Sequence, residues 1–297
     1  MLDIISIPNY NTSSFTRSNT WKGEKMPPLK VLVTGVYGLI PGAIYETLQA
    51  RPEKYDVSAL ARRCVPSDRV PHGKTLQIPE EKFQLVDLAD LDIVEKAMQG
   101  VDVVVQMAAD PRPEASWESL LSSNIIGSRN VFEAAHRQGV KRVVFASSIM
   151  VSWGYQLDNP YKAIAEGRFE DVEVDELHTV THEWPIRPTG LYPATKAWGE
   201  ALGRFYADVH NMSVICLRIG WVNAEDRPHK PELSAIWCSR RDIVQLTERS
   251  INAPEDLRFD IFYGVSNNKW GWVDIDHPRE VLGYIPQDSS EEGLAES

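Results

Sequence analysis

The feature that most constrains this chain is an apolar run, residues 30–34, that leads through a glycine-bearing turn into a helix-like segment. Strand, glycine turn and helix in this order are typical of a dinucleotide-binding unit. Gly35 permits the tight turn, and Gly38 lets a pyrophosphate approach the backbone at the positive end of the helix. Pro41 stands where a third glycine is expected, and proline is tolerated in a first helical turn. An ordinary tight turn is the alternative. The residues predicted to contact a dinucleotide here are Gly35, Tyr37, Gly38, Leu39 and Ile40.

Length and composition exclude several classes of protein. The 297 residues suffice for one large α/β domain, with or without a smaller lobe, and 43% hydrophobic residues allow a sizeable core. A net charge of -11 argues against nucleic acid or an anionic membrane as partner, because either needs a basic patch. No apolar run approaches the roughly 20 residues that cross a bilayer. Three widely spaced cysteines without a CxxC motif indicate free thiols in a reducing compartment, and we expect a cytoplasmic protein.

The domain organisation follows from where apolar periodicity begins. Residues 1–29 show none and are predicted to be a flexible tail, with a transit peptide or a true start at Met26 as alternatives. We assign residues 30–222 to a dinucleotide-binding domain that also carries the catalytic residues. The remaining 223–297 are predicted to form a small substrate-binding region.

Strand-like and helix-like segments alternate after the glycine turn, which predicts βαβ units. The continuous apolar run at 101–109 is typical of a strand buried on both faces of a parallel sheet. We therefore predict an α/β fold: a Rossmann-type doubly wound parallel sheet with a small C-terminal lobe. The stretch 153–190 is predicted to be a long loop that covers a site. Further strands are predicted at 55–60, 85–88, 142–148, 213–220 and 259–263, and helices at 91–98, 114–138, 192–206 and 241–251.

The ends of the predicted strands carry the candidate cofactor contacts. An acid at the end of the second strand bonds the ribose of NAD, whereas an arginine there accommodates the 2′-phosphate of NADP. Ala61 occupies the acid's position and is followed by Arg62 and Arg63. We therefore predict NADP, with NAD as the alternative, although two arginines can also form a merely solvated pair. The next strand ends in Asp87 and Leu88, and an acid at this place commonly lies near an adenine. The strand after it ends in Ala108 and Ala109, whose small side chains would leave room for a cofactor.

Three further patterns bear on chemistry. Asn124 falls within the apolar stripe of a predicted helix, and a buried amide needs partners. It is therefore either a structural bridge or an active-site residue. Tyr192 and Lys196 stand four apart on a predicted helix and share a face. His178 and His182 are also four apart, but no third ligand accompanies them, so we predict no metal site.

Together these motifs resemble the extended short-chain dehydrogenase/reductase superfamily, of the NAD-dependent epimerase/dehydratase type. The resemblance covers about residues 30–221, and Tyr192-x-x-x-Lys196 after a strand ending in Ser147-Ser148 is its most specific part. The other matching motifs are Thr34-Gly35-x-x-Gly38, Asp87-Leu88, Met107-Ala108-Ala109, Asn124 and Arg218-Ile219-Gly220.

The resemblance implies a Ser-Tyr-Lys catalytic triad. Tyr192 would be the general acid/base, and Lys196 with the oxidised nicotinamide would lower its phenol pKa from about 10. Ser148 would hold the reacting oxygen, with Ser147 as the alternative, and Asn124 would support the site. Hydride transfer itself belongs to the nicotinamide.

The C-terminal third resembles the uronate dehydrogenase branch, which oxidises the C1 hydroxyl of hexuronic acids with NAD. The pocket departs from that branch in four ways. Ile149 and Met150 replace a polar pair, Trp221 replaces a serine, and Pro111 or Arg112 stands where another serine is expected. The carboxylate-binding arginine falls near Glu232, although Arg227 or Lys230 could serve. The candidate substrate contacts are Arg112, Ile149, Met150 and Trp221. The motifs that carry the resemblance are 237–242, 263–268 and 282–286.

The leading hypothesis is therefore an NADP-linked oxidoreductase that acts on a secondary alcohol or carbonyl of a small sugar-like or more apolar substrate. The alternatives are a uronate dehydrogenase that uses NAD, a sugar epimerase or dehydratase that retains its cofactor, and a non-enzymatic nucleotide sensor. A sensor is disfavoured because Tyr192 and Lys196 are both present. A homodimer is expected from the resemblance, with the helices at 114–138 and 192–210 pairing, although Trp198 and Phe205 are equally explained as core.

Overall fold

The computed structural model describes residues 27–71, 73, 75–173 and 177–291. Most of the tail predicted for 1–29 lies outside these residues, and Leu29 already begins the first strand. Among the residues that the structure describes, no helix combines the length and apolar character needed to cross a bilayer.

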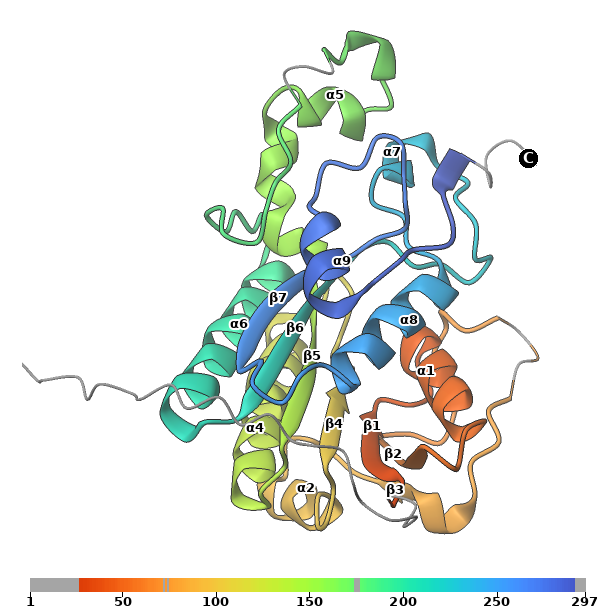
Figure 1. The fold of residues 1–297 in the computed structure, drawn as a ribbon, viewed down its shortest axis with the longest axis vertical. Helices are drawn as coiled ribbons and strands as arrows, with labels where there is room; N and C mark the ends of the chain where they lie inside the picture. Colours follow the sequence, from red (N-terminus) through yellow and green to blue (C-terminus); the bar gives the residue numbers. More distant parts are fainter. Residues whose placement is uncertain (1–26, 72, 74, 174–176, 292–297) are drawn as a thin grey trace, which may run out of the picture.

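Seven parallel strands form one sheet in the order β3-β2-β1-β4-β5-β6-β7 (Figure 1). The chain runs outward from β1 to β3 and then returns to β4 beside β1. This reversal defines a doubly wound sheet, in which ligands bind beyond the carboxyl ends of the strands. The predicted fold class is confirmed. The strands are β1 Leu29–Thr34, β2 Tyr55–Ala61, β3 Phe83–Leu85, β4 Val103–Gln106, β5 Arg142–Ser148, β6 Ser213–Ile219 and β7 Phe259–Gly264.

Helices cover both faces of this sheet (Figure 1). Helices α1 and α8 contact each other on one face, and α2, α4 and α6 form a continuous row on the other. The short helices α5 and α7 follow β5 and β6, so they lie beyond the carboxyl ends of the strands. The helices are α1 Leu39–Gln49, α2 Leu91–Ala97, α3 Trp117–Leu120, α4 Gly127–Arg137, α5 Tyr161–Ala165, α6 Leu191–His210, α7 Pro231–Ser234, α8 Arg240–Ile251 and α9 Asp276–Leu282.

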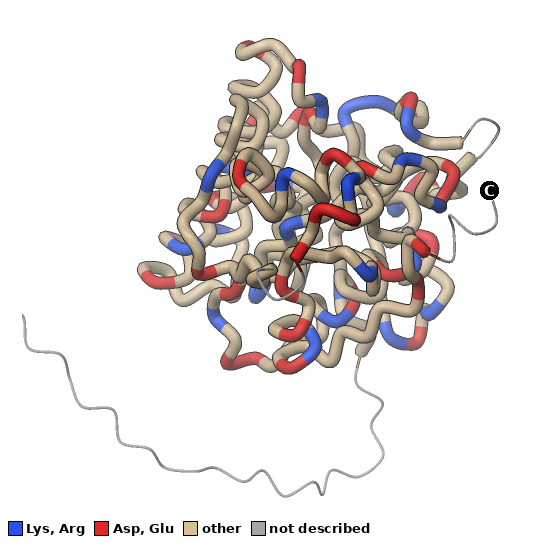
Figure 2. Tube along the Cα trace, turned by 90° about the horizontal axis from the view of Figure 1, so that it is seen from above, with Lys and Arg blue, Asp and Glu red and all other residues tan. Residues whose placement is uncertain are grey.

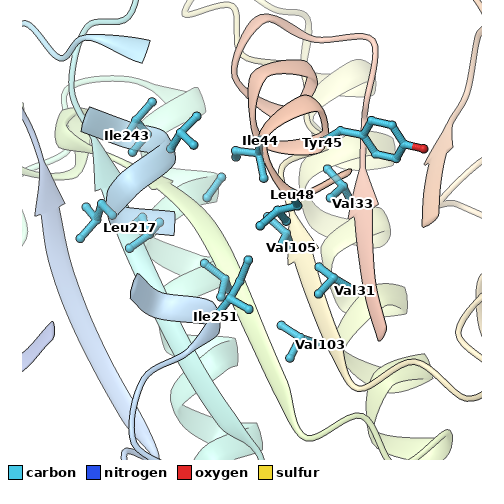
Figure 3. Close-up of a cluster of buried hydrophobic side chains, with 14 of the residues drawn as sticks. Val31, Val33, Ile44, Tyr45, Leu48, Val103, Val105, Leu217, Ile243 and Ile251 are labelled. Atoms are coloured by element: carbon cyan, nitrogen blue, oxygen red, sulfur yellow. The ribbon is translucent and has the colours of Figure 1, made fainter. Parts of the chain in front are cut away.

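The core consists of β-branched and aliphatic side chains packed between the sheet and these helices. Figure 3 shows Ile44 and Leu48 of α1 packed toward the valines of β1 and β4, and Ile243 of α8 toward Leu217 of β6. These side chains are at most 3% exposed. The strand predicted from the continuous apolar run at 101–109 is β4, and all four of its residues are buried.

Three predicted elements differ from the structure. The helix expected over 114–138 is α3 and α4 joined by a π-helical turn at Leu121–Ile126, and Trp117 is 50% exposed rather than part of its buried stripe. The strand expected at 85–88 ends at Leu85. The loop expected over 153–190 contains α5 and two 3₁₀ turns, because apolar side chains there pack into a cluster of their own around Trp272.

The region predicted to bind substrate, 223–297, also contributes to the main sheet. Its strand β7 pairs with β6 over six residues, and its helix α8 packs against β5, β6 and β7. A domain boundary at residue 222 stays a prediction. In the described part of the chain, lysines and arginines are interspersed with acidic residues along the trace (Figure 2).

Candidate active site

A cavity of about 630 Å³ opens beyond the carboxyl ends of the central strands. It extends from the glycine turn after β1 to the ends of β5 and β6. Except for Asn124 and the two alternative carboxylate-binding residues Arg227 and Lys230, the predicted cofactor, substrate and catalytic residues line this one cavity. They are Gly35, Tyr37, Gly38, Leu39, Ile40, Arg62, Arg63, Asp87, Leu88, Ala108, Ala109, Arg112, Ser148, Ile149, Met150, Tyr192, Lys196 and Trp221.

The glycine turn is held tightly against the end of β4. Gly35 has a φ of +69°, and a Cβ there would lie 2.9 Å from the Cα of Ala108, so only glycine fits. The hydroxyl of Thr34 accepts hydrogen bonds from the backbone N–H of Met107, at 3.0 Å, and of Ala108, at 2.9 Å. The ends of β1 and β4 therefore form one rigid floor for the cavity.

Helix α1 begins at this floor and fits a pyrophosphate. Its N-cap is Gly38, which has no side chain to bond the first backbone N–H groups. The N–H groups of Leu39 and Ile40 precede the first i−4 acceptor of the helix, and a helix N-terminus favours an anion. Pro41 lies within the first turn, where its missing N–H disrupts no helical bond.

Arginines from the chain after β2 line the cavity. Arg62 and Arg63 directly follow Ala61, the last residue of β2, and both are exposed. Arg69 was missed, because it falls in an irregular stretch with no motif. Its guanidinium donates a hydrogen bond to the carbonyl of Val222 at 3.2 Å, which joins the chain after β2 to the chain after β6.

Tyr192 and Lys196 lie on the buried face of α6 at the other end of the cavity. The Lys196 ammonium lies 5.8 Å from the centre of the Tyr192 ring and donates a hydrogen bond to the carbonyl of Ala146 at 2.8 Å. Desolvation lowers the pKa of Lys196 to about 8. Desolvation also raises the pKa of Tyr192, and the hydrogen-bonded Ser148 hydroxyl opposes that rise.

The two serines at the end of β5 have different partners. Ser147 donates a hydrogen bond of 2.6 Å to the Glu200 carboxylate, which is also paired with the Arg218 guanidinium at 2.9 Å. This ion pair is almost fully buried, with side chains 1% and 6% exposed. Ser147 is thus held by a buried network, whereas the hydroxyl of Ser148 bonds Tyr192. The geometry favours Ser148 over Ser147.

Asn124 lies buried in the π-helical turn, and both the oxygen and the nitrogen of its side-chain amide form hydrogen bonds. Its oxygen accepts from the N–H of Asp110 at 2.8 Å, and its nitrogen donates to the Asp110 carbonyl and to the Thr195 hydroxyl. Because Asn124 does not line the cavity, its contacts are those of a bridge between α6 and the chain after β4.

The part of the cavity predicted to contact substrate combines the Arg112 guanidinium with apolar walls. Asp110 accepts two hydrogen bonds from the Arg112 guanidinium, at 2.9 and 2.6 Å, and a third from Ser119. These bonds hold the pKa of Asp110 well below its usual range. The side chain of Arg112 remains 63% exposed. Sequence patterns missed several of the apolar residues that complete the walls: Trp153, Leu233 and Ile236.

Comparisons with known proteins agree with this geometry. A model of the NAD dependent epimerase/dehydratase family matches residues 31–237. The chain is 36% identical to the NAD-dependent glucose-6-phosphate dehydrogenase of Haloferax volcanii, over 88% of this chain and 94% of that protein. It is 33% identical to L-arabinose 1-dehydrogenase (NAD(P)(+)) of the same organism, over 69% and 82% respectively.

Comparison with solved structures also finds sugar dehydrogenases. The structure of uronate dehydrogenase from Agrobacterium tumefaciens matches with a TM-score of 0.72 at 30% identity, covering 91% of this chain and 89% of that one. The resemblance to the extended short-chain dehydrogenase/reductase pattern and its uronate dehydrogenase branch is confirmed. With its fold, its glycine turn and more than half of its length matched, the chain belongs to the NAD dependent epimerase/dehydratase family.

Proposed function

We propose that this enzyme is an NADP-linked dehydrogenase that transfers a hydride from the C1 hydroxyl carbon of a monosaccharide. One observation carries the proposal: Ser148, Tyr192 and Lys196 lie at one end of the cavity whose other end holds the glycine turn and two arginines. The relatives support it, because their names describe dehydrogenases of glucose 6-phosphate, arabinose and uronate.

The catalytic roles follow from the contacts. Ser148 holds the reacting oxygen beside Tyr192, and the Tyr192 phenolate removes the hydroxyl proton as the C–H bond yields its hydride. A phenolate in this dry site needs a cation, and Lys196 supplies one on the same face of α6. The chemistry that a nicotinamide would supply, when bound in the cavity, is acceptance of the hydride. Asn124 positions α6 and does not touch the reacting atoms.

The preference for NADP rests on the end of β2. No carboxylate follows Ala61 to bond a ribose 2′-hydroxyl, and Arg62 and Arg63 line the cavity instead. Guanidinium groups bind phosphate through charge-assisted hydrogen bonds. The arabinose dehydrogenase relative, named for NAD(P)(+), shows that both cofactors occur among such proteins.

The residues that line the cavity restrict the class of substrate that we propose. Ile149, Met150 and Trp221 line the cavity with mostly apolar side chains. The only good hydrogen-bond donor among these three side chains is the indole N–H of Trp221. Arg112 and Arg69 are exposed cations at this end, and the charge of Arg69 acts to lower the pKa of Tyr192. We propose an aldose or an aldose phosphate, whose anionic or polar groups bond Arg112, in preference to a free hexuronic acid.

Steady-state rates with glucose 6-phosphate, arabinose and glucuronate, each with NADP⁺ and NAD⁺, test this function. We expect turnover of an aldose or its phosphate with NADP⁺.

Tyr192→Phe removes the proton acceptor and is expected to lower kcat at least about 100-fold. Cofactor affinity, measured by fluorescence titration, should stay within about twofold because the ring remains. Near-normal activity of Tyr192→Phe contradicts the assignment.

A further inference from the structure

A second group of chemically active side chains lies away from the cavity, where three distant segments meet. His182 comes from the stretch between β5 and α6, Asp260 from β7, and His277 from α9. One donor atom of each lies within 4.8 Å of the other two. Asp260 Oδ1 is 2.9 Å from His277 Nε2 and 4.0 Å from His182 Nε2.

The backbone holds these segments together independently of the three side chains. Val180 and Val273 form a parallel bridge, in which the N–H of Val180 donates to the Trp272 carbonyl and the N–H of Asp274 donates to the Val180 carbonyl. The N–H of His277 donates to the Asp274 carboxylate at the start of α9. The two imidazoles therefore meet because main-chain contacts place them there.

The hydrogen bonding of His182 is incomplete. Its Nδ1 is buried with no partner among the described residues. Its Nε2 is too far from Asp260 for a hydrogen bond. Buried polar atoms in proteins almost always have partners, and those that do not need an explanation.

The donor set matches a metal ion. Two imidazoles and one carboxylate are ligands of borderline divalent metals, and Zn²⁺ binds such atoms at about 2.0–2.2 Å. With metal–ligand bonds of that length, two donor atoms on one ion lie about 3 Å apart. Asp260 Oδ1 and His277 Nε2, at 2.9 Å, already lie at this separation. His182 must move closer. Its ring is stacked on His277, with centroids 4.4 Å apart and planes at 17°, so it must also turn out of the stack. No hydrogen bond among the described residues opposes that turn.

We propose that His182, Asp260 and His277 bind one divalent transition-metal ion, with water completing its coordination. None of the three lines the cavity, and Asp260 pairs in register with Ile215, four residues before the cavity-lining Ile219. The ion is therefore structural. It joins the stretch between β5 and α6 to the sheet and to α9, and it replaces the proton between His277 and Asp260.

The full-length chain, stripped with a chelator, is dialysed against Zn²⁺ and its metal content is measured. We expect one Zn²⁺ per chain and a thermal unfolding midpoint that rises with Zn²⁺ and falls with chelator. His182→Gln, Asp260→Asn and His277→Gln should each weaken binding at least tenfold. His182 has no hydrogen bond among the described residues, so His182→Gln leaves the apo fold intact and stays informative if the other two variants misfold.

The matched control is another close pair of imidazoles, His136 and His210, with centroids 4.0 Å apart and planes at 40°. In the described chain, no third ligand residue joins this pair. His136→Gln should leave Zn²⁺ binding unchanged. A wild-type chain that takes up no Zn²⁺, or a His182→Gln variant that binds it as tightly as wild type, overturns the proposal.

Discussion

Lys196 is an ammonium group enclosed between α6 and β5, and its burial makes stability depend on pH. Its pKa is about 8 in the folded chain against 10.5 as the ordinary value. Between these values the unfolded chain binds more protons, so this group adds stability as pH rises from 8 to 10.5. A shift of that size corresponds to about 3 kcal/mol.

Lys196→Met removes this titration. We expect the free energy of unfolding of wild type to rise, relative to the variant, by up to about 3 kcal/mol over that pH range. Urea unfolding of both proteins at a series of pH values measures the difference. If the two curves run parallel across the range, Lys196 is not buried as a charged group.

Arg62 and Arg63 decide the cofactor in our proposal. Because a guanidinium bonds the 2′-phosphate of NADP and has no counterpart in NAD, Arg62→Ala with Arg63→Ala should weaken NADP at least about tenfold, or 1.4 kcal/mol. Affinity for NAD should stay nearly constant. The control is Lys141→Ala, since Lys141 pairs with Asp102 and does not line the cavity. Equal weakening of both cofactors would remove the 2′-phosphate argument.

Helix α6 carries the proposed catalytic residues, and Gly199 sets its distance from the sheet. A Cβ at Gly199 would lie 2.3 Å from Cζ of Phe145 on β5. Alanine is the better helix former by about 1 kcal/mol, so propensity alone predicts that Gly199→Ala stabilises the protein. Overpacking of about 1–3 kcal/mol acts in the opposite direction.

We expect Gly199→Ala to be destabilised in urea unfolding and to turn over more slowly, because Tyr192 and Lys196 move with the helix. Ala201 is exposed on the same helix, so Ala201→Gly reports helix propensity without contact with the sheet. A Gly199→Ala variant that is more stable than wild type would show that α6 can shift away from β5 without cost.

The elements that the sequence predicts well are those whose environment is simplest. Strands β4, β5 and β6 are covered on both faces, so an apolar run is sufficient to find them. The π-helical turn has no such pattern, because it depends on where Asn124 finds partners on two other elements. The short helices between β5 and α6 form against Trp272, about a hundred residues later in the chain.

At the scale of the whole molecule, the predicted homodimer bears on the exposed apolar side chains of α6 and α3. Phe205 is 48% exposed and Val209 63%, so Phe205 does not belong to the core. Trp117 on the neighbouring α3 is 50% exposed. Exposed apolar side chains on a surface are a feature of interaction sites. We propose that this side pairs with a second copy of the chain.

Light scattering coupled to gel filtration tests the pairing. We expect wild type at twice the mass of one chain and Phe205→Glu at the mass of one. Leu157→Glu is the control, since Leu157 is 65% exposed at a different part of the fold. A wild-type chain that is monomeric at high concentration contradicts a dimer through this surface.

The glycine turn, the strand ends, the Tyr-x-x-x-Lys spacing and the family resemblance predicted about half of the residues that line the cavity. Arg69, Trp153 and Ile236 could not be found this way. Each enters the cavity through contacts between segments far apart in the chain, as the bond from Arg69 to Val222 illustrates.

Ser148 is the last residue of β5 and Tyr192 is the second residue of α6, so the stretch between these elements, residues 149–190, separates the two hydroxyl-bearing residues. Both hydroxyls are thus fixed by rigid elements, whatever the chain does between them. That stretch nevertheless supplies Met150 and Trp153 to the wall of the cavity. A related chain could therefore acquire a new specificity by insertion or deletion within this one segment, with its reaction chemistry inherited unchanged.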